Sequence, residues 1–312
     1  MPLQILIYFA LAMFVIVNLV RLIRIAAMPV HLRWELYPVP HEPADKVKYG
    51  GSYLEETDWW TKSIHTNRFG ELKIMVPEIL FLKGIWEHNR KLWLWSWLLH
   101  LGLYFLIGVA VLAILGSILQ LAGVSAASGS NPGVGSGLFY LMRVLYWTAV
   151  VAGSIGSIGV LMMRLFHPRL KGYTSIGAVF NLLFILAIFI TGLASLVVHK
   201  GMVGETLSLA RGLLTFGTVE MSRPIATAHI AIIALFMLYF PFTHMTHMFA
   251  KYFTYHSIRW DDSPTRTGGK IEKRISRYLA YPVRWSAPHI RGDGRKTWLD
   301  VVKERGFADG EK

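Results

Sequence analysis

The chain has 312 residues, of which 54% are hydrophobic and 16% are charged, and its formal net charge is +13 at pH 7. This composition excludes an ordinary soluble domain, because soluble domains carry about 25% charged residues. Since the chain contains no cysteine, it cannot bind an iron–sulfur cluster through thiolates, attach haem covalently or form a disulfide. Any redox centre must therefore be held by histidine or methionine.

Five apolar runs are long enough to cross the hydrocarbon core of a membrane, which requires about 18 residues or more in a helix. The runs are Leu3–Ile25, Leu92–Leu121, Leu138–Leu165, Ile176–Val198 and Pro224–Phe249. The first run lacks the basic start and the cleavage site of a signal peptide, so we expect it to remain as a span. The sequence therefore predicts an all-α membrane protein, a five-helix transmembrane bundle.

Lysine and arginine gather on one side of the predicted spans. Residues 21–91 contain eleven, residues 164–171 contain three and residues 251–312 contain fourteen, whereas residues 123–137 contain none. The positive-inside rule then places the N-terminus outside and the C-terminus in the cytoplasm, in a multi-pass protein of the cytoplasmic (inner) membrane. The positive charge therefore reflects membrane topology, and we expect no nucleic-acid partner.

Two segments on the cytoplasmic side are too long to be simple turns. The first is the loop 28–91 within the predicted membrane domain 1–256, where VPEILFLKGIWEHNRK predicts an interfacial helix with Pro77 in its first turn; the alternative is a solvated loop on the membrane. The second is the tail 257–312, which mixes charges with large aromatic residues. Because tails that keep tryptophan usually bury it, the tail predicts a docking surface for a partner subunit.

Three of the twelve histidines lie well inside predicted spans, namely His100, His229 and His247. Ionisable residues within a membrane are functional by default. In one continuous helix His229 and His247 would share a stripe about 27 Å apart, because 18 residues complete five turns at about 100° each. This arrangement predicts axial ligands for b-type haem near both membrane faces, with His100 and His247 around the inner haem. The alternatives are hydrogen bonding to a neighbouring helix, and His244 as a rival ligand.

Glycine and arginine residues in the predicted spans could contact a cofactor, or they could serve helix packing and anchoring at the membrane interface. Gly153, Gly156 and Gly159 recur every three residues in the third span, where they permit close approach of a cofactor or of another helix. Arg143 and Arg223 lie near the predicted outer ends of their spans. Either arginine could pair with a haem propionate, and snorkelling to the membrane interface would explain both equally well.

Several motifs carry a family resemblance. A histidine followed 18 residues later by the second histidine of FPFTHMTH, together with HLGLYFLIG beginning at His100, resembles the gamma subunit of respiratory nitrate reductase. HLRWELYPVPHE, YGGSYLEE, PEILFLKG and WSAPHI are similar to a branch from sulfate reducers and related anaerobes, whose members serve DsrM-type, TmcC-type and heterodisulfide-reductase-type complexes. The resemblance covers the spans over residues 90–256. It implies a cytochrome b subunit that transfers electrons between the menaquinone pool and a cytoplasmic iron–sulfur subunit of the heterodisulfide-reductase type.

One position departs from that family pattern. The family has a second histidine ten residues after the one matched by His100, and this chain has Ala110 there. The outer haem then lacks its expected second ligand beside His229. His199 could replace it and Met142 is a weaker candidate, but we expect an open or weakly filled position, since His199 lies at the very end of its span.

The quinone site is expected on the outer side, where polar residues stand in otherwise uncharged surroundings, with the cytoplasmic face as the alternative location. The candidate residues are Arg143, Arg223, His199, Lys200, Glu205 and Glu220. The alternative function is that of a transporter or structural anchor, in which buried histidines relay protons or pack against other helices.

Overall fold

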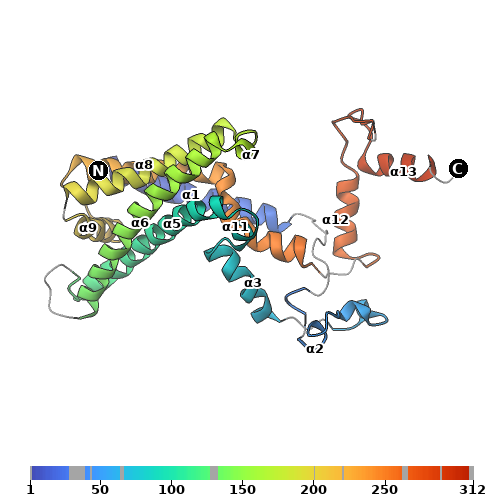
Figure 1. Cartoon of the computed structure of the whole chain (residues 1–312), viewed down its shortest axis with the longest axis horizontal. Coiled ribbons are helices and arrows are strands. Elements are labelled where there is room, and N and C mark those ends of the chain that lie inside the picture. Colours follow the sequence, from blue (N-terminus) through green and yellow to red (C-terminus); the bar gives the residue numbers. More distant parts are fainter. Residues whose placement is uncertain are drawn as a thin grey trace. The chain divides into compact units, whose positions relative to one another are not determined.

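The computed structural model of the chain describes residues 2–27, 39–42, 44–63, 67–126, 133–199, 201–219, 221–261, 266–288 and 290–308. These residues are mainly helical and form no β-strand, apart from an isolated bridge between Pro282 and Thr297 (Figure 1). The α-helices are α1 (Pro2–Ala27), α2 (Ala44–Val47), α3 (Arg68–Leu80), α4 (Lys83–His88), α5 (Arg90–Leu121), α6 (Val134–Phe166), α7 (Pro168–Lys171), α8 (Ile176–Val198), α9 (Met202–Thr215), α10 (Pro224–Tyr239), α11 (His247–Phe253), α12 (Lys270–Leu279) and α13 (Trp298–Ala308).

Five helical segments of the described residues are long and apolar enough to cross a membrane, which confirms the predicted all-α, multi-pass architecture. They are α1, α5, α6, α8 and the segment Pro224–Phe242, which contains α10. The observed bounds of α8 are the predicted ones, and those of α1, α5 and α6 agree with prediction to within about one turn. The orientation of the termini stays a prediction.

Local capping explains where two of these helices begin. The side chain of Ser175 accepts a hydrogen bond from the backbone N–H of Ala178 at 3.2 Å, at the start of α8. The side chain of Asn89 accepts one from the N–H of Leu92 at 3.0 Å, at the start of α5. Serine and asparagine are preferred at this position because they satisfy N–H groups that have no partner within the helix.

The prediction of a continuous fifth span to Phe249 is wrong. Helix α10 ends at Tyr239 and is followed by two 3-10 turns, Phe240–Phe242 and His244–Thr246, before α11 begins at His247. Pro241 explains the break, because proline has no N–H to donate and its ring clashes with the carbonyl four residues earlier. The common stripe for His229 and His247 required an unbroken helix, so that geometric argument no longer holds.

The chain forms two compact units. One consists of Met1–Leu19 and Phe69–Thr246, and the other of Val20–Arg68 and His247–Lys312. The first unit contains α5, α6, α8, α9 and α10, and therefore most of the spanning segments. The second contains the described parts of the early loop and of the C-terminal tail; residues 31–38 of the motif HLRWELYPVPHE lie outside the described residues.

Helices α5 and α6 pack along each other in the first unit through glycines (Figure 1). A Cβ atom on Gly102 would lie 2.5 Å from the Cα of Gly153, and one on Gly156 would lie 2.2 Å from the backbone nitrogen of Leu99. Neither position has room for a larger residue. Such close backbone approach increases dispersion contacts, which drive helix association in lipid. The glycines on this face therefore serve helix packing.

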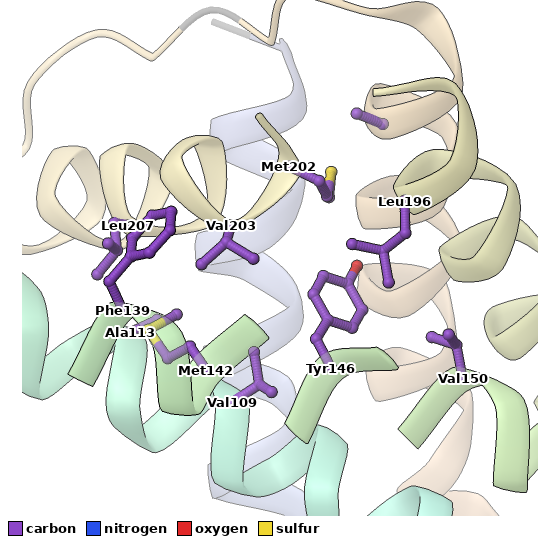
Figure 2. Close-up of a cluster of buried hydrophobic side chains, with 11 residues drawn as sticks. Val109, Ala113, Phe139, Met142, Tyr146, Val150, Leu196, Met202, Val203 and Leu207 are labelled. Atoms are coloured by element: carbon purple, nitrogen blue, oxygen red, sulfur yellow. The ribbon is translucent and has the colours of Figure 1, made fainter. Parts of the chain in front are cut away.

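Helix α9 covers one end of this helix pair and is an element that the sequence analysis did not predict. Figure 2 shows Met202, Val203 and Leu207 of α9 meeting buried side chains of α5, α6 and α8. The buried hydroxyl of Ser117 also donates a hydrogen bond to the carbonyl of Leu207 at 3.0 Å. Helix α9 has only 14 residues, of which half are apolar, so it is too short and too polar to be predicted as a membrane span from sequence.

The predicted start of the interfacial helix is wrong. Helix α3 begins at Arg68, so that Pro77 lies near its end and not in its first turn. Two hydrogen bonds connect this region to α5, one from Tyr104 Oη to the carbonyl of Ile79 and one from Trp93 Nε1 to the carbonyl of Phe81, both at 2.6 Å. The exposed large apolar side chains of α3, which suit a membrane surface, are Phe69, Leu72, Val76, Ile79 and Leu80.

A small ion-pair cluster stabilises the early part of the second unit. The carboxylate of Glu56 accepts hydrogen bonds from the Nζ atoms of Lys46 and Lys62, the latter at 2.9 Å. These two lysines lower the pKa of Glu56 to about 2. The hydrogen bond to Glu56 also raises the pKa of Lys46.

Replacing Gly156 by leucine should disrupt the α5–α6 contact, because a side chain there meets the backbone of Leu99. We expect a loss of about 1–3 kcal/mol in the free energy of unfolding, measured by denaturant titration in detergent. Gly137→Leu is the matched control, since a Cβ atom at Gly137, on the same helix, meets nothing within 4 Å. Equal stability of the two variants would contradict this account of the packing.

The Glu56 cluster should make the second unit sensitive to acid. The pKa of Glu56 is about 2 in the folded chain against 4.5 for an unperturbed glutamate, so its stabilisation is present above pH 4.5 and is lost as the pH falls toward 2. Hydrogen exchange of residues 44–62 in the full chain, corrected for intrinsic rates, should reveal this loss. Glu56→Gln should remove the pH dependence and Glu55→Gln should retain it. An unchanged profile in Glu56→Gln would refute the assignment.

Candidate functional site

His229 is the most deeply buried of the predicted ligands. It lies on α10, in the first unit, and its side chain is 0% exposed. Its Nδ1 atom lies 3.0 Å from Oγ1 of Thr191, and its ring stacks against that of Tyr146 with centroids 6.1 Å apart. Its Nε2 atom is buried and has no hydrogen-bond partner among the described residues.

Two consecutive residues of α8 shape the surroundings of this imidazole. The hydroxyl of Thr191 donates a hydrogen bond to the carbonyl of Ala187 at 2.7 Å, so its oxygen is left to accept one from Nδ1–H of His229. Gly192 lies directly against the ring, since a Cβ atom there would lie 2.9 Å from Cε1 and 3.3 Å from Nε2. The absence of a side chain at Gly192 therefore makes room for the imidazole itself.

This arrangement presents a neutral imidazole with an available lone pair, which is the form in which histidine binds metals. Among the described residues, no group of three or more histidine, cysteine, aspartate or glutamate side chains could hold a metal ion. Haem does not need such a group, because its porphyrin supplies four nitrogen ligands and the protein supplies one or two. The buried Nε2 atom without a partner fits an axial haem ligand.

His100 lies on α5 and is partly buried. Its Nδ1 atom lies 2.7 Å from the carbonyl oxygen of Ser96, one turn earlier, and its ring centroid lies 6.1 Å from that of Tyr104. A hydrogen bond from one ring nitrogen to a backbone carbonyl orients metal-binding histidines, and it also occurs in histidines that only pack. The role of His100 as a haem ligand stays a prediction.

The two histidines near the end of the fifth span lie outside any regular spanning helix. His244 begins the second 3-10 turn in the first unit and His247 begins α11 in the second unit; both side chains are exposed. The pairing of His100 with His247 around an inner haem stays a prediction. The rival choice of His244 also stays open.

The Nε2 atom of His199 already has polar neighbours within the protein. It ends α8, and its Nε2 atom lies 3.2 Å from Oε1 of Glu205 and 3.4 Å from Oγ of Ser222. The N–H of Ser222 donates to the same carboxylate oxygen at 2.9 Å. His199 thus joins the end of α8 to α9 and to the segment before α10. Its role as the replacement ligand of the outer haem stays a prediction, and the structure directs its Nε2 atom to Glu205 instead.

Ala110, where this chain departs from the family pattern, lies on the exposed face of α5. Its neighbour Val109, by contrast, is buried in the core cluster of Figure 2. A histidine side chain at position 110 would therefore be attached on the exposed face of α5 and not within the core cluster. Met142, the weaker candidate, is fully buried in that same cluster.

A cavity of about 400 Å³ borders α6, α8 and α9. Its lining residues are Arg143, Trp147, Leu196, Val197 and Val203. Arg143 is exposed at this cavity, and Arg223 is the exposed N-cap residue of α10, so the predicted propionate contacts stay predictions. Of the expected polar residues of the quinone site, Lys200 and Glu220 lie outside the described residues.

Sequence reasoning found His229 but missed the α8 residues beside it. Thr191 is 38 residues from His229 along the chain, and neither Thr191 nor Gly192 belongs to a motif that would single it out. Comparisons with protein-family models, with curated proteins and with solved structures give no match for this chain. Its function must therefore be inferred from its own sequence and geometry.

Proposed function

We propose that this chain is the membrane cytochrome b subunit of an oxidoreductase complex, which transfers electrons between a quinone pool and a cytoplasmic iron–sulfur subunit of the heterodisulfide-reductase type. The observation that carries the proposal is the buried His229, with an unpartnered Nε2 atom beside Gly192. When bound, b-type haem supplies reversible one-electron chemistry. The protein supplies ligands, orientation and an apolar environment.

The unpartnered nitrogen argues against a purely structural role for His229. A buried polar atom without a partner costs about 1–3 kcal/mol, so buried histidines that only pack normally satisfy both ring nitrogens. Coordination to iron would satisfy Nε2 without a further protein group. The neighbouring Thr191 already satisfies Nδ1, and metal-binding histidines commonly donate their other ring N–H to such a hydrogen-bond acceptor.

The alternative of a proton-coupled transporter has weaker support. Proton relays in membranes use chains of carboxylate and histidine side chains. None of the five spanning helices contains an aspartate or a glutamate. The contacts of His229 are a hydroxyl, an aromatic ring and apolar groups, which do not form such a chain.

We assign the quinone to the cavity lined by Arg143 and Trp147. Its volume of about 400 Å³ lies within the range of small-molecule sites, about 300–1,000 Å³. The guanidinium group of Arg143 can donate a hydrogen bond to a quinone oxygen, while Leu196, Val197 and Val203 suit a ring and an isoprenoid tail. Val203 lies two residues before Glu205 in the chain, so the His199–Glu205 pair is a nearby candidate for proton exchange.

The C-terminal tail is the proposed docking surface for the iron–sulfur subunit. Trp285 is 50% exposed and Tyr281 is 48% exposed, and basic residues surround them in the sequence. Tryptophan, tyrosine and arginine are enriched in the residues that dominate protein interfaces. The chain itself has no cysteine for iron–sulfur clusters, so a partner must carry them.

The haem assignment can be tested on the purified protein by a reduced-minus-oxidised optical spectrum, with haem supplied during expression. We expect a b-type alpha band in the wild type and the loss of one haem in His229→Ala. His88→Ala is the control, because His88 is exposed on α4. Addition of imidazole to His229→Gly should restore the lost signal, which separates ligation from folding. A wild type without any alpha band under these conditions would refute the proposal.

The docking assignment predicts that removal of residues 266–312 releases the iron–sulfur subunit and leaves the haem spectrum unchanged. The deletion starts after Trp260, because this buried residue packs against Tyr255. Trp285→Ala tests the same surface with less perturbation and should weaken co-purification of the partner. Stoichiometric retention of the partner by both variants would exclude this surface as its docking site.

A further inference from the structure

We infer that Thr191 is a positioning residue that selects which nitrogen of His229 is available as a ligand. The inference rests on the proposed function, because it concerns how the chain prepares His229 for haem. It assigns a role to α8 (Ile176–Val198), which contains none of the proposed haem ligands. The decisive geometry is the contact of 3.0 Å between Oγ1 of Thr191 and Nδ1 of His229.

The direction of this hydrogen bond follows from the other contacts of Thr191. Its hydroxyl lies 2.7 Å from the carbonyl oxygen of Ala187 and 3.1 Å from that of Ile188. A carbonyl oxygen cannot donate, so the single hydroxyl proton points toward the backbone of α8. Oγ1 can then only accept from His229, which requires the proton of the neutral imidazole to reside on Nδ1. The lone pair must therefore reside on Nε2.

The other ring nitrogen supports the same tautomer. Nε2 is buried without a hydrogen-bond partner among the described residues, as expected for the nitrogen that carries a lone pair and no proton. Within a lipid-embedded helix pair there is no bulk water to exchange the proton between the two nitrogens. Thr191 and the α8 backbone thus fix a tautomer that a solvated histidine would not favour so strongly.

A second side chain of α8 holds the two helices in register. Ser195, which is fully buried one turn after Thr191, donates to the carbonyl of Thr191 at 2.7 Å and lies 3.3 Å from that of Ile225. Ile225 precedes His229 by one turn on α10. Ser195 therefore contacts the backbone of α10 and not the imidazole, which makes it a control for packing between the same two helices.

The hydrogen bond to Nδ1–H has a predictable effect on a bound metal. Because it increases the electron density on the imidazole, it makes Nε2 a stronger donor and favours the oxidised, ferric state of iron. Loss of the hydroxyl should weaken haem binding and raise the midpoint potential of the haem bound by His229. A residue that only fills space would change neither the tautomer nor the potential.

The test uses the full-length protein in detergent or nanodiscs. The His229-dependent haem is defined as the optical signal that His229→Ala loses. For Thr191→Val we expect a fall of about 10- to 100-fold in haem affinity, measured by titration of the haem-free protein, and a higher midpoint potential. Thr191→Ser keeps the hydroxyl and should restore both values. Ser195→Ala should lower thermal stability and leave the potential unchanged.

Thr191→Ala provides a smaller variant if valine prevents folding, and it should show the same two changes. Wild-type affinity and potential in both Thr191→Val and Thr191→Ala would overturn the inference while the proposed function stands. The same is true if Ser195→Ala shifts the potential as strongly as Thr191→Val, because the effect would then come from packing. A wild type without any His229-dependent haem would overturn both the inference and the proposed function.

Discussion

Hydrocarbon offers no hydrogen-bond partners, so every polar group within a spanning segment must be satisfied by the chain or by something that the chain binds. Several side chains of the spanning helices follow this rule by bonding to the carbonyl one turn earlier, as Ser117 does with Ala113 and Thr148 with Val144. Among the described residues, the hydroxyls of Ser154 and Ser157 on α6 and Oδ1 of Asn18 on α1 are buried without a partner. Nε2 of His229 is buried without a partner too, and it lies beside the backbone of Gly192.

The same small residues that permit packing also create the surroundings of His229. Helix α6 approaches α5 through Gly156, and Gly153 makes room for the ring of Phe189 on α8. These close approaches place α6 between its two neighbours. As a result Tyr146 stacks on the imidazole and Val150 lies at the position that a side chain on Gly192 would occupy. Packing and site geometry therefore depend on the same contacts, which is typical of cofactor sites on rigid elements.

The break after Tyr239 changes the functional interpretation of the fifth span. A continuous helix would have made one rigid element of His229 and His247, one near each membrane face. Pro241 and the two 3-10 turns instead assign His229 to the spanning unit and His247 to the unit that contains the tail. The proline thereby removes the fixed spacing and orientation that a regular helix would have given to these two histidines.

The sequence by itself determined the five spanning segments, because the length and hydrophobicity of each run are set by the thickness of the membrane and not by neighbouring helices. It also singled out His229 as a candidate ligand, because an ionisable residue in lipid is costly and is therefore a functional candidate. Pro241 is a signal for the end of α10, but the apolar residues on both sides of the proline led to the prediction of a single continuous span. Only the tertiary structure brought Thr191 and Gly192 next to the imidazole and directed His199 to Glu205. Those contacts join different helices, and no local sequence pattern encodes which faces of two apolar helices will meet.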